Sequence, residues 1–231
     1  MNPENLAAAT VAPWRARDAA LALLAGFAAS FLGAVLVLDG GLSTIELFAL
    51  VLPLQSAGTL ACAFAMARRR GPVRTVLALD ARWSDLVGVA VGAGIQVVGA
   101  AVALSIIETF FGGEVPGQEV VTAATETEGW GIRLLVMLGL VVFGPIAEEV
   151  AFRGMLLPAL LGRGRRRAVI VSSAWFAGIH LIDPGAAFSV PFLFVLALVL
   201  ANERLRTGRL ARSVAIHAGF NLITVIAVFA T

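Results

Sequence analysis

The sequence predicts an all-α fold: a polytopic transmembrane helical bundle of about seven spans with its N-terminus in the cytoplasm. Hydrophobic residues fill 59% of the 231 positions and charged residues only 14%, an apolar share well above that of a soluble domain. The mean hydropathy is +0.93, and the apolar residues come in blocks of roughly 20, about the length that a helix needs to cross a bilayer. We therefore expect a single integral membrane domain over residues 1–231, located in the cell membrane as a multi-pass protein.

Seven apolar segments are the predicted spans. The first follows two arginines, as in a signal peptide, but it is longer than the apolar part of a signal peptide and no small-residue cleavage site follows. We therefore interpret it as a retained span. The fifth and sixth are short, and Asp183-Pro184-Gly185 between them predicts a tight turn at the membrane surface. The segments are 19–38, 44–66, 86–111, 132–161, 168–182, 188–203 and 212–230.

The connections between these spans alternate in charge. All 17 basic residues are arginines, and most of them gather before the first span and after the second, fourth and sixth, whereas the other connections are mainly acidic. Because basic residues gather on the cytoplasmic side, the N-terminus is expected inside and the C-terminus outside. The long outer connection, residues 112–131, is interpreted as a linker, with a lid as the alternative. A chain without lysine or a basic tail is not expected to bind nucleic acid.

Small residues in the third span predict a close contact between helices. Gly88, Gly92 and Gly94 lie in this span. In lipid, small residues let the backbones of two helices approach closely. We therefore expect another helix to pack against this stretch.

The stretch GPIAEEVAFRG, residues 144–154, places three charges inside the fourth span. A charge near the bilayer centre costs roughly 2.5 to 3.5 kcal/mol on insertion scales, so each charge needs a partner. Glu149 and Arg153 are four residues apart in the favoured order and are expected to form a supporting ion pair. Glu148 points about 100° away from Glu149 and must find its partners on other helices. Pro145 lies just before them and frees backbone carbonyls, which favours a polar pocket beside Glu148.

Both histidines of the chain lie in later spans, His180 in the fifth and His217 in the seventh. Asn221 follows His217 by four residues and therefore shares its face of the helix. For His217 to reach the depth of the other polar residues, the last helix is expected to begin near Arg206, before its apolar boundary. The fourth, fifth and seventh helices would then bring Glu148, His180, His217 and Asn221 together.

This set of side chains can hydrolyse a peptide bond without a covalent intermediate. A carboxylate and a neutral imidazole that meet at one water can remove its proton, and an imidazole and an amide can hold the oxygen that becomes negative. No serine motif competes for this role, and the only cysteine, Cys62, has no histidine near it in sequence. Zinc is the alternative, with Glu148, His180 and His217 as ligands, although no HExxH motif is present.

Three short motifs follow one another in the second half of the chain: EEVAFRG at 148–154, WFAGIH at 175–180 and HAGFN at 217–221. In this order they resemble the EExxxR, FxxxH and HxxxN motifs of the CPBP family of intramembrane endopeptidases. These are also called CAAX protease and bacteriocin-processing proteins, and they include type II CAAX prenyl endopeptidases. The similarity covers about residues 85–230, which would be the protease-like core.

The resemblance implies a role for each matching position. Glu148 matches the catalytic glutamate, which activates water together with His180. His217 and Asn221 match the pair that stabilises the oxyanion. The expected activity is therefore that of a glutamate-dependent intramembrane endopeptidase.

The remaining motif residues are expected to support the site. Glu149 and Arg153 match positions thought to hold the site together, and Phe176 is expected to pack beneath it. The family was first described as metalloproteases and later as glutamate-dependent enzymes without metal. We follow the second view and expect no cofactor, with zinc as the open alternative.

The expected partners are membrane lipid and a protein or peptide substrate, lipidated or not. Eukaryotic members of the family cleave prenylated CAAX proteins, and prokaryotic members have varied or unknown substrates. Two other functions stay open. One is a non-catalytic immunity or scaffold protein of the same fold. The other is a proton-coupled transporter, although transporters often show paired repeats with broken helices in both halves, and this chain has no such symmetry.

Overall fold

Long helices make up the structure, as the predicted fold class requires. The computed structural model describes residues 14–112, 123 and 129–229, and no strand occurs within these ranges. Within the described residues, six stretches of helix are long and apolar enough to cross a membrane, which indicates a multi-pass membrane protein. They are Ala16–Leu36, Thr44–Arg68, Trp83–Phe111, Trp130–Arg163, Pro184–Thr207 and Leu210–Ala227.

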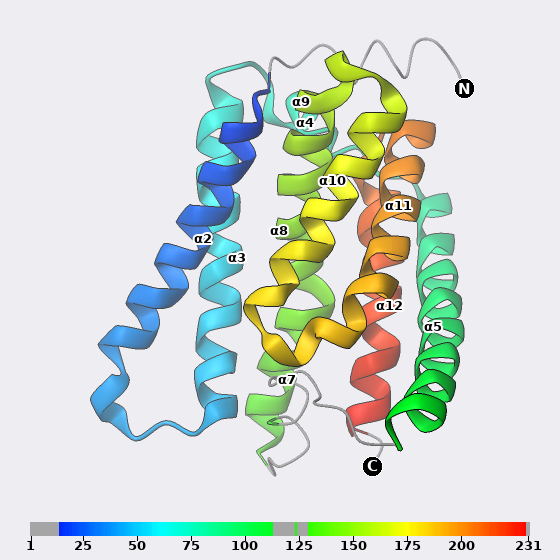
Figure 1. Ribbon diagram of the computed structural model, residues 1–231. Coiled ribbons are helices and arrows are strands. Elements are labelled where there is room, and N and C mark those ends of the chain that lie inside the picture. Colours follow the sequence, from blue (N-terminus) through cyan, green and yellow to red (C-terminus); the bar gives the residue numbers. More distant parts are fainter. Residues whose placement is uncertain (1–13, 113–122, 124–128, 230–231) are drawn as a thin grey trace.

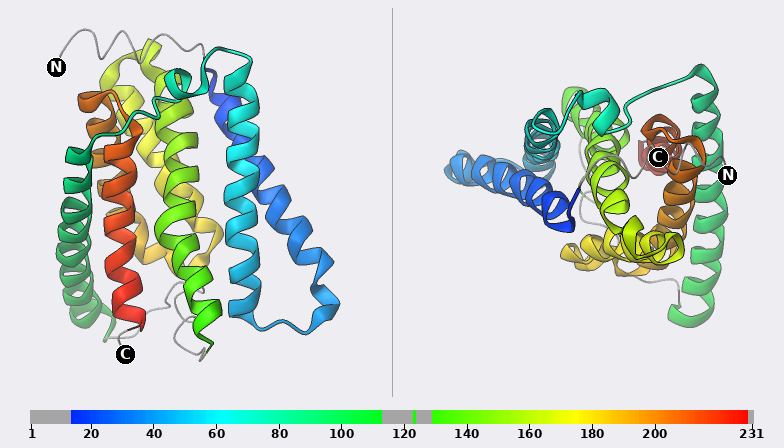
Figure 2. Two further views of the ribbon diagram at one scale, coloured as in Figure 1. Left: turned by 180° about the vertical axis from the view of Figure 1, so that it is seen from behind. Right: turned by 90° about the horizontal axis from the view of Figure 1, so that it is seen from above.

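The helices run up and down through the bundle. α2 (Ala16–Leu36) and α3 (Thr44–Arg68) form a hairpin on one side, and α5 (Val87–Phe111) packs against α12 (Leu210–Phe229) on the other. Seen from above, the helix of residues 130–163 lies between these two pairs (Figure 2). This central helix carries the charged EEVAFRG motif, so the fold places the motif inside the bundle.

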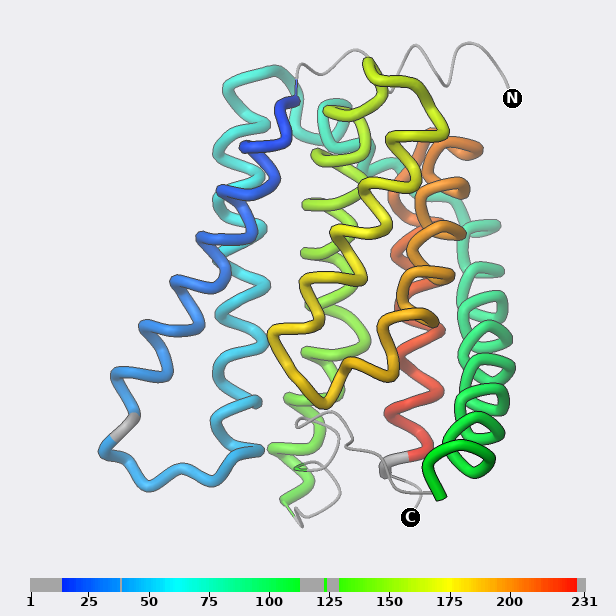
Figure 3. Tube along the Cα trace, viewed as in Figure 1, coloured from blue at the N-terminus to red at the C-terminus, as the bar shows by residue number. Residues whose placement is uncertain are grey.

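The fifth predicted span, 168–182, differs most from its prediction. It corresponds to α10 (Arg165–Ile179), whose 15 residues rise about 22 Å, less than a hydrocarbon core of about 30 Å. Two short 3₁₀ turns, η6 (His180–Ile182) and η7 (Pro184–Ser189), then lead into α11 (Val190–Thr207). These turns lie short of the ends of the neighbouring helices (Figure 3). α10 is not among the six long helices, so seven crossings remain a prediction.

The turn predicted at residues 183–185 explains why α10 ends early. The Asp183 carboxylate accepts a hydrogen bond of 2.8 Å from the Gly185 N–H, and Pro184 has no N–H with which to continue a helix. The chain therefore reverses at this point, and His180 comes to lie at the end of α10, inside the bundle rather than beyond it.

Two π-helical segments interrupt the central helix on either side of the glutamates. The main-chain N–H of Gly144 bonds to the carbonyl of Gly139, five residues earlier, as in a π-helix. Such segments occur frequently at functional sites. In chain order the parts are α7 (Trp130–Leu138), the π-helix η3 (Gly139–Phe143), α8 (Gly144–Glu149), the π-helix η4 (Val150–Leu156), α9 (Leu157–Leu160) and the 3₁₀ turn η5 (Leu161–Arg163).

Glycines bring α5 and α12 into close contact, as predicted for Gly88 and Gly92. A Cβ atom at Gly88 would lie 2.9 Å from the Arg212 carbonyl, and one at Gly92 would overlap the Ile216 carbonyl. A Cβ atom at Gly94 would meet nothing within 4 Å, so the contact predicted at this glycine is wrong. The contact of Gly92 with Ile216 therefore positions the part of α12 that carries His217.

α12 begins at Leu210, so the predicted start near Arg206 was too early. Gly208, with a φ of 72°, ends α11 before it. Arg209 donates to both oxygens of Asp85, from Nε at 3.1 Å and from Nη2 at 2.7 Å. Hydrogen bonding to Asp85 raises the pKa of Arg209. This bidentate pair fixes the start of α12 to the turn η2 (Trp83–Leu86).

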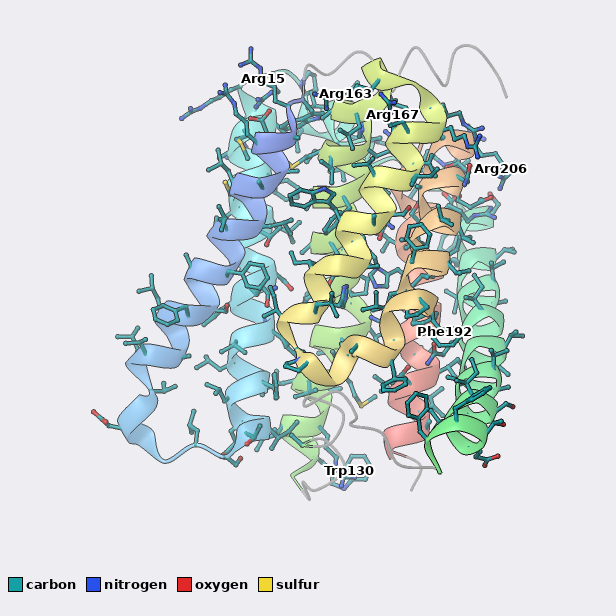
Figure 4. The ribbon with its side chains drawn as sticks, in the orientation of Figure 1. Arg15, Trp130, Arg163, Arg167, Phe192 and Arg206 are labelled. Carbon is teal, nitrogen blue, oxygen red and sulfur yellow. The ribbon has the colours of Figure 1, made fainter. Side chains whose placement is uncertain are left out.

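The arginine-rich connections lie together at one end of the bundle. Arg15, Arg163, Arg167 and Arg206 are all at this end, and Trp130 is at the opposite end (Figure 4). The alternation of charge along the sequence therefore corresponds to two ends of the fold. The cytoplasmic location of the arginine-rich end remains a prediction, and most of the outer connection 112–131 lies outside the described residues.

Candidate active site

Glu149 and Arg153 form the predicted ion pair in the interior of the bundle. Arg153 Nη1 lies 2.8 Å from Glu149 Oε1, and both residues are fully buried. Arg153 also donates from Nη2 to the carbonyl of Ala197 on α11 at 3.2 Å. Its guanidinium lies 4.4 Å from the centre of the Phe176 ring on α10. The pair therefore connects the central helix with both α10 and α11.

His217 lies between the two glutamates. Its Nδ1 atom is 3.2 Å from Glu149 Oε1, and its Nε2 atom is 3.8 Å from Glu148 Oε2. The Glu149 oxygen also accepts from Arg153, which identifies it as a carboxylate acceptor, so we assign the proton to Nδ1 of His217. The separation of 3.8 Å from Glu148 exceeds hydrogen-bond length. The contact between Glu149 and His217 was not predicted.

The two glutamates differ in exposure. The side chain of Glu148 is 33% exposed and that of Glu149 is 0% exposed. Glu148 Oε2 is buried and makes no hydrogen bond within the described residues. Glu148 is therefore the carboxylate of this motif that a water or a substrate can reach, while Glu149 serves the ion pair.

His180 is the first residue of η6, at the end of α10. Its Nδ1 atom lies 2.8 Å from the main-chain carbonyl of Phe176. Because a carbonyl oxygen can only accept, we assign the proton to Nδ1, which leaves a lone pair on Nε2 of the neutral ring. Within the described residues no hydrogen bond or ion pair joins His180 directly to Glu148.

Phe176 lies at the centre of the predicted site. The residue is fully buried, and its ring centre is 5.1 Å from that of His180 and 5.5 Å from that of His217. Phe152 packs edge-on against the same ring at 5.3 Å. One aromatic side chain thus contacts both imidazoles, which agrees with the predicted packing role of Phe176.

Asn221 is engaged in a contact that was not predicted. Its Nδ2 atom donates a hydrogen bond of 2.7 Å to the main-chain carbonyl of Leu140, in the π-helix η3. An amide nitrogen carries two N–H groups, so one remains for another acceptor. The only signal for this contact in the sequence was Pro145, which was expected to free a backbone carbonyl nearby.

The alternative zinc site does not fit the described residues. Among them, no three His, Cys, Asp or Glu side chains are placed to hold a metal ion. The two nitrogens of His217 face different glutamates, and Nδ1 of His180 bonds to a carbonyl. Glu148, His180 and His217 therefore do not form a zinc ligand set in this arrangement.

Comparison with known proteins supports the motif resemblance. Residues 130–223 match the family model described as type II CAAX prenyl endopeptidase Rce1-like. This segment contains the four predicted catalytic residues and the residues predicted to support them. No curated protein and no solved structure was found to match the chain.

Proposed function

Since residues 130–223 match the family model of Rce1-like type II CAAX prenyl endopeptidases, we propose that this membrane protein hydrolyses a peptide bond with water activated by Glu148 and His180. The family supports an intramembrane CAAX-type endopeptidase in general. The observation that carries the finer proposal is the exposure of Glu148, the reachable carboxylate, beside His217. The proposed substrate is a membrane-associated protein or peptide, and the proposed location is the cell membrane with the arginine-rich end in the cytoplasm.

The first step is the attack of water. Glu148 takes a proton from a water that also donates a hydrogen bond to Nε2 of His180, and the water oxygen bonds to the carbonyl carbon of the substrate. A bridging water suits two groups that do not contact each other directly. The hydrogen bond from His180 to the Phe176 carbonyl supports this step because it leaves Nε2 free to accept.

The oxygen that becomes negative is held by His217 and Asn221. Asn221 provides the Nδ2–H that Leu140 does not use. His217 donates from Nε2 only when both ring nitrogens carry a proton, and the Glu149 carboxylate then accepts from Nδ1. Hydrogen-bond donors that are fixed before the reaction stabilise such an oxyanion without reorganisation.

The second step breaks the peptide bond. The tetrahedral intermediate collapses, the C–N bond breaks, and the amine that leaves takes the proton held by Glu148. One water is consumed, giving a carboxylic acid and an amine, and Glu148 returns to its starting state. Glu149, Arg153 and Phe176 hold the imidazoles in place during both steps.

A comparison of membrane proteomes tests the proposal. Membranes from cells that produce the wild type, Glu148→Gln or His180→Ala are compared for protein termini that differ. Glu108→Gln, an exposed glutamate on α5, is the matched control. We expect new termini in the wild type and the control and none in the two site variants. Termini that persist in Glu148→Gln would refute water activation by this residue.

A further inference from the structure

The main-chain carbonyl of Leu140 has lost its helical partner. In an α-helix it would accept from the N–H of residue 144, and in a π-helix from that of residue 145. The N–H of Gly144 is bonded to the carbonyl of Gly139 instead. Residue 145 is proline, which has no N–H. Leu140 is therefore without a main-chain donor in either register.

Asn221 supplies the missing donor from α12, at 2.7 Å. Leaving such a carbonyl unpaired costs about 1–3 kcal/mol where it is buried, so this contact is favourable. The contact also determines the orientation of the amide group. Because the Leu140 carbonyl cannot donate, the nitrogen of Asn221 must face it and the amide oxygen must point away. Because the amide group is planar, the hydrogen bond of the first N–H also fixes the direction of the second N–H.

We propose that Pro145 is a positioning residue for Asn221. By withholding an N–H from Leu140, Pro145 leaves a carbonyl that orients the amide of Asn221, so that its second Nδ2–H can donate to the oxyanion. This inference rests on the proposed function. Pro145 contacts neither the substrate nor the reacting atoms and acts only through Leu140 and Asn221.

The test is the variant Pro145→Ala, which restores the missing N–H. The N–H of residue 145 then competes with Asn221 for the Leu140 carbonyl, and the amide loses its fixed orientation. We expect kcat to fall about 10-fold or more, though less than the roughly 10² to 10³-fold that follows deletion of an oxyanion donor, with KM nearly unchanged. The melting temperature should stay the same or rise, because alanine suits a helix interior better than proline.

Pro158→Ala is the matched control. Pro158 lies in α9, just after the second π segment of the same long helix. Within the described residues no side chain donates to the carbonyls of Arg153 or Gly154, which would be the helical partners of an N–H at residue 158. This control should change stability in the same direction as Pro145→Ala and leave kcat at the wild-type value.

Kinetic and stability measurements can overturn the inference. One contradicting result is a wild-type kcat for Pro145→Ala. Another is a loss of folded protein in Pro145→Ala while Pro158→Ala folds, because the proposal requires that the helix gains an N–H without losing stability. An equal fall of kcat in both variants would also overturn it, since the effect would then belong to any proline of this helix.

A spectroscopic measurement separates this inference from the proposed function. The chain has four asparagines, so labelling with ¹⁵N-asparagine gives few side-chain amide signals, and Asn221→Ala assigns the one of interest. We expect slow exchange of the Asn221 Nδ2–H in the wild type and in Glu148→Gln, and faster exchange in Pro145→Ala. If these rates are found but no proteolysis occurs, the proposed function fails and the positioning by Pro145 stands. Equal exchange in the wild type and Pro145→Ala overturns the positioning.

Discussion

The carboxylate of Glu149 contacts Nδ1 of His217 at 3.2 Å through the same oxygen that accepts from Arg153. The ion pair of the central helix thus also contacts α12, and Arg153 helps, through Glu149, to hold the imidazole of His217 in place. A change at Arg153 should therefore affect both the stability of the fold and the orientation of His217.

Arg153→Ala is expected to destabilise the protein by about 3–5 kcal/mol, because it leaves the buried carboxylate of Glu149 without its partner. Thermal unfolding of the detergent-solubilised protein measures this loss. Arg206→Ala is the control, because Arg206 forms an exposed pair with Glu203 and such pairs contribute at most about 1 kcal/mol. Normal stability of Arg153→Ala with a loss of activity alone would contradict the structural role.

Phe176→Ala is expected to lose about 3–5 kcal/mol of stability, the usual effect of removing a buried phenylalanine ring. It should also lower kcat, since both imidazoles lose the ring that they contact. Trp175→Ala is the matched control, because this adjacent aromatic side chain is 63% exposed. Thermal unfolding and turnover of the two variants are compared. Equal effects at the two positions would show that contact with the histidines is not the cause.

Asn221→Ala is expected to lower kcat by about 10² to 10³-fold through loss of one oxyanion donor. It should also cost about 1–3 kcal/mol of stability, because the Leu140 carbonyl loses its donor. Asn202→Ala is the control, since Asn202 makes an exposed hydrogen bond of the same type to the Leu198 carbonyl at 2.8 Å. Single-turnover kinetics of both variants measure the difference. An unchanged kcat in Asn221→Ala would exclude its role at the oxyanion.

The sequence predicts the membrane bundle well because apolar segments and arginine-rich connections can be recognised from consecutive residues. It predicts less well where a helix ends, because apolar composition does not show how far a helix extends before the chain reverses. The predicted span 168–182 illustrates this point. The turn at residues 183–185 was predicted from its residues, but its depth in the bundle depends on how α10 packs against α11.

Within the site, contacts along one helix were predictable and contacts between helices were not. The pair Glu149–Arg153 follows from a spacing of four residues. The contacts Glu149–His217 and Asn221–Leu140 depend on how one helix is rotated about its axis relative to another. A π segment adds one residue to a turn and so changes which face of the helix the following residues occupy. The order of the motifs along the sequence did not indicate which atoms would contact each other across helices.

Treatment with a chelator is expected to leave the activity unchanged, because the described residues offer no ligand set for zinc. Elemental analysis of the purified protein should find less than one zinc per chain. Thermolysin, a zinc protease, serves as the positive control for the chelator. Loss of activity that is restored by zinc and not by calcium would contradict the metal-free mechanism.

Alanine substitutions at Gly92 and Gly94 should have opposite effects on stability. At Gly92 a Cβ atom would overlap the Ile216 carbonyl and lie 2.7 Å from the Phe220 nitrogen, so α5 and α12 must separate, at a cost of about 1–3 kcal/mol. At Gly94 an added Cβ atom would meet nothing within 4 Å, and alanine should stabilise the helix by about 0.5–1 kcal/mol. Thermal unfolding of the two variants shows whether each substitution lowers or raises the stability.

The same pair of variants connects packing with catalysis. His217 follows Ile216 directly, so a displacement of α12 in Gly92→Ala should move the imidazole away from both glutamates and lower kcat. Gly94→Ala should leave kcat unchanged, because α12 keeps its position. If Gly92→Ala were as stable and as active as Gly94→Ala, the close contact between α5 and α12 would not be what places His217 in the site.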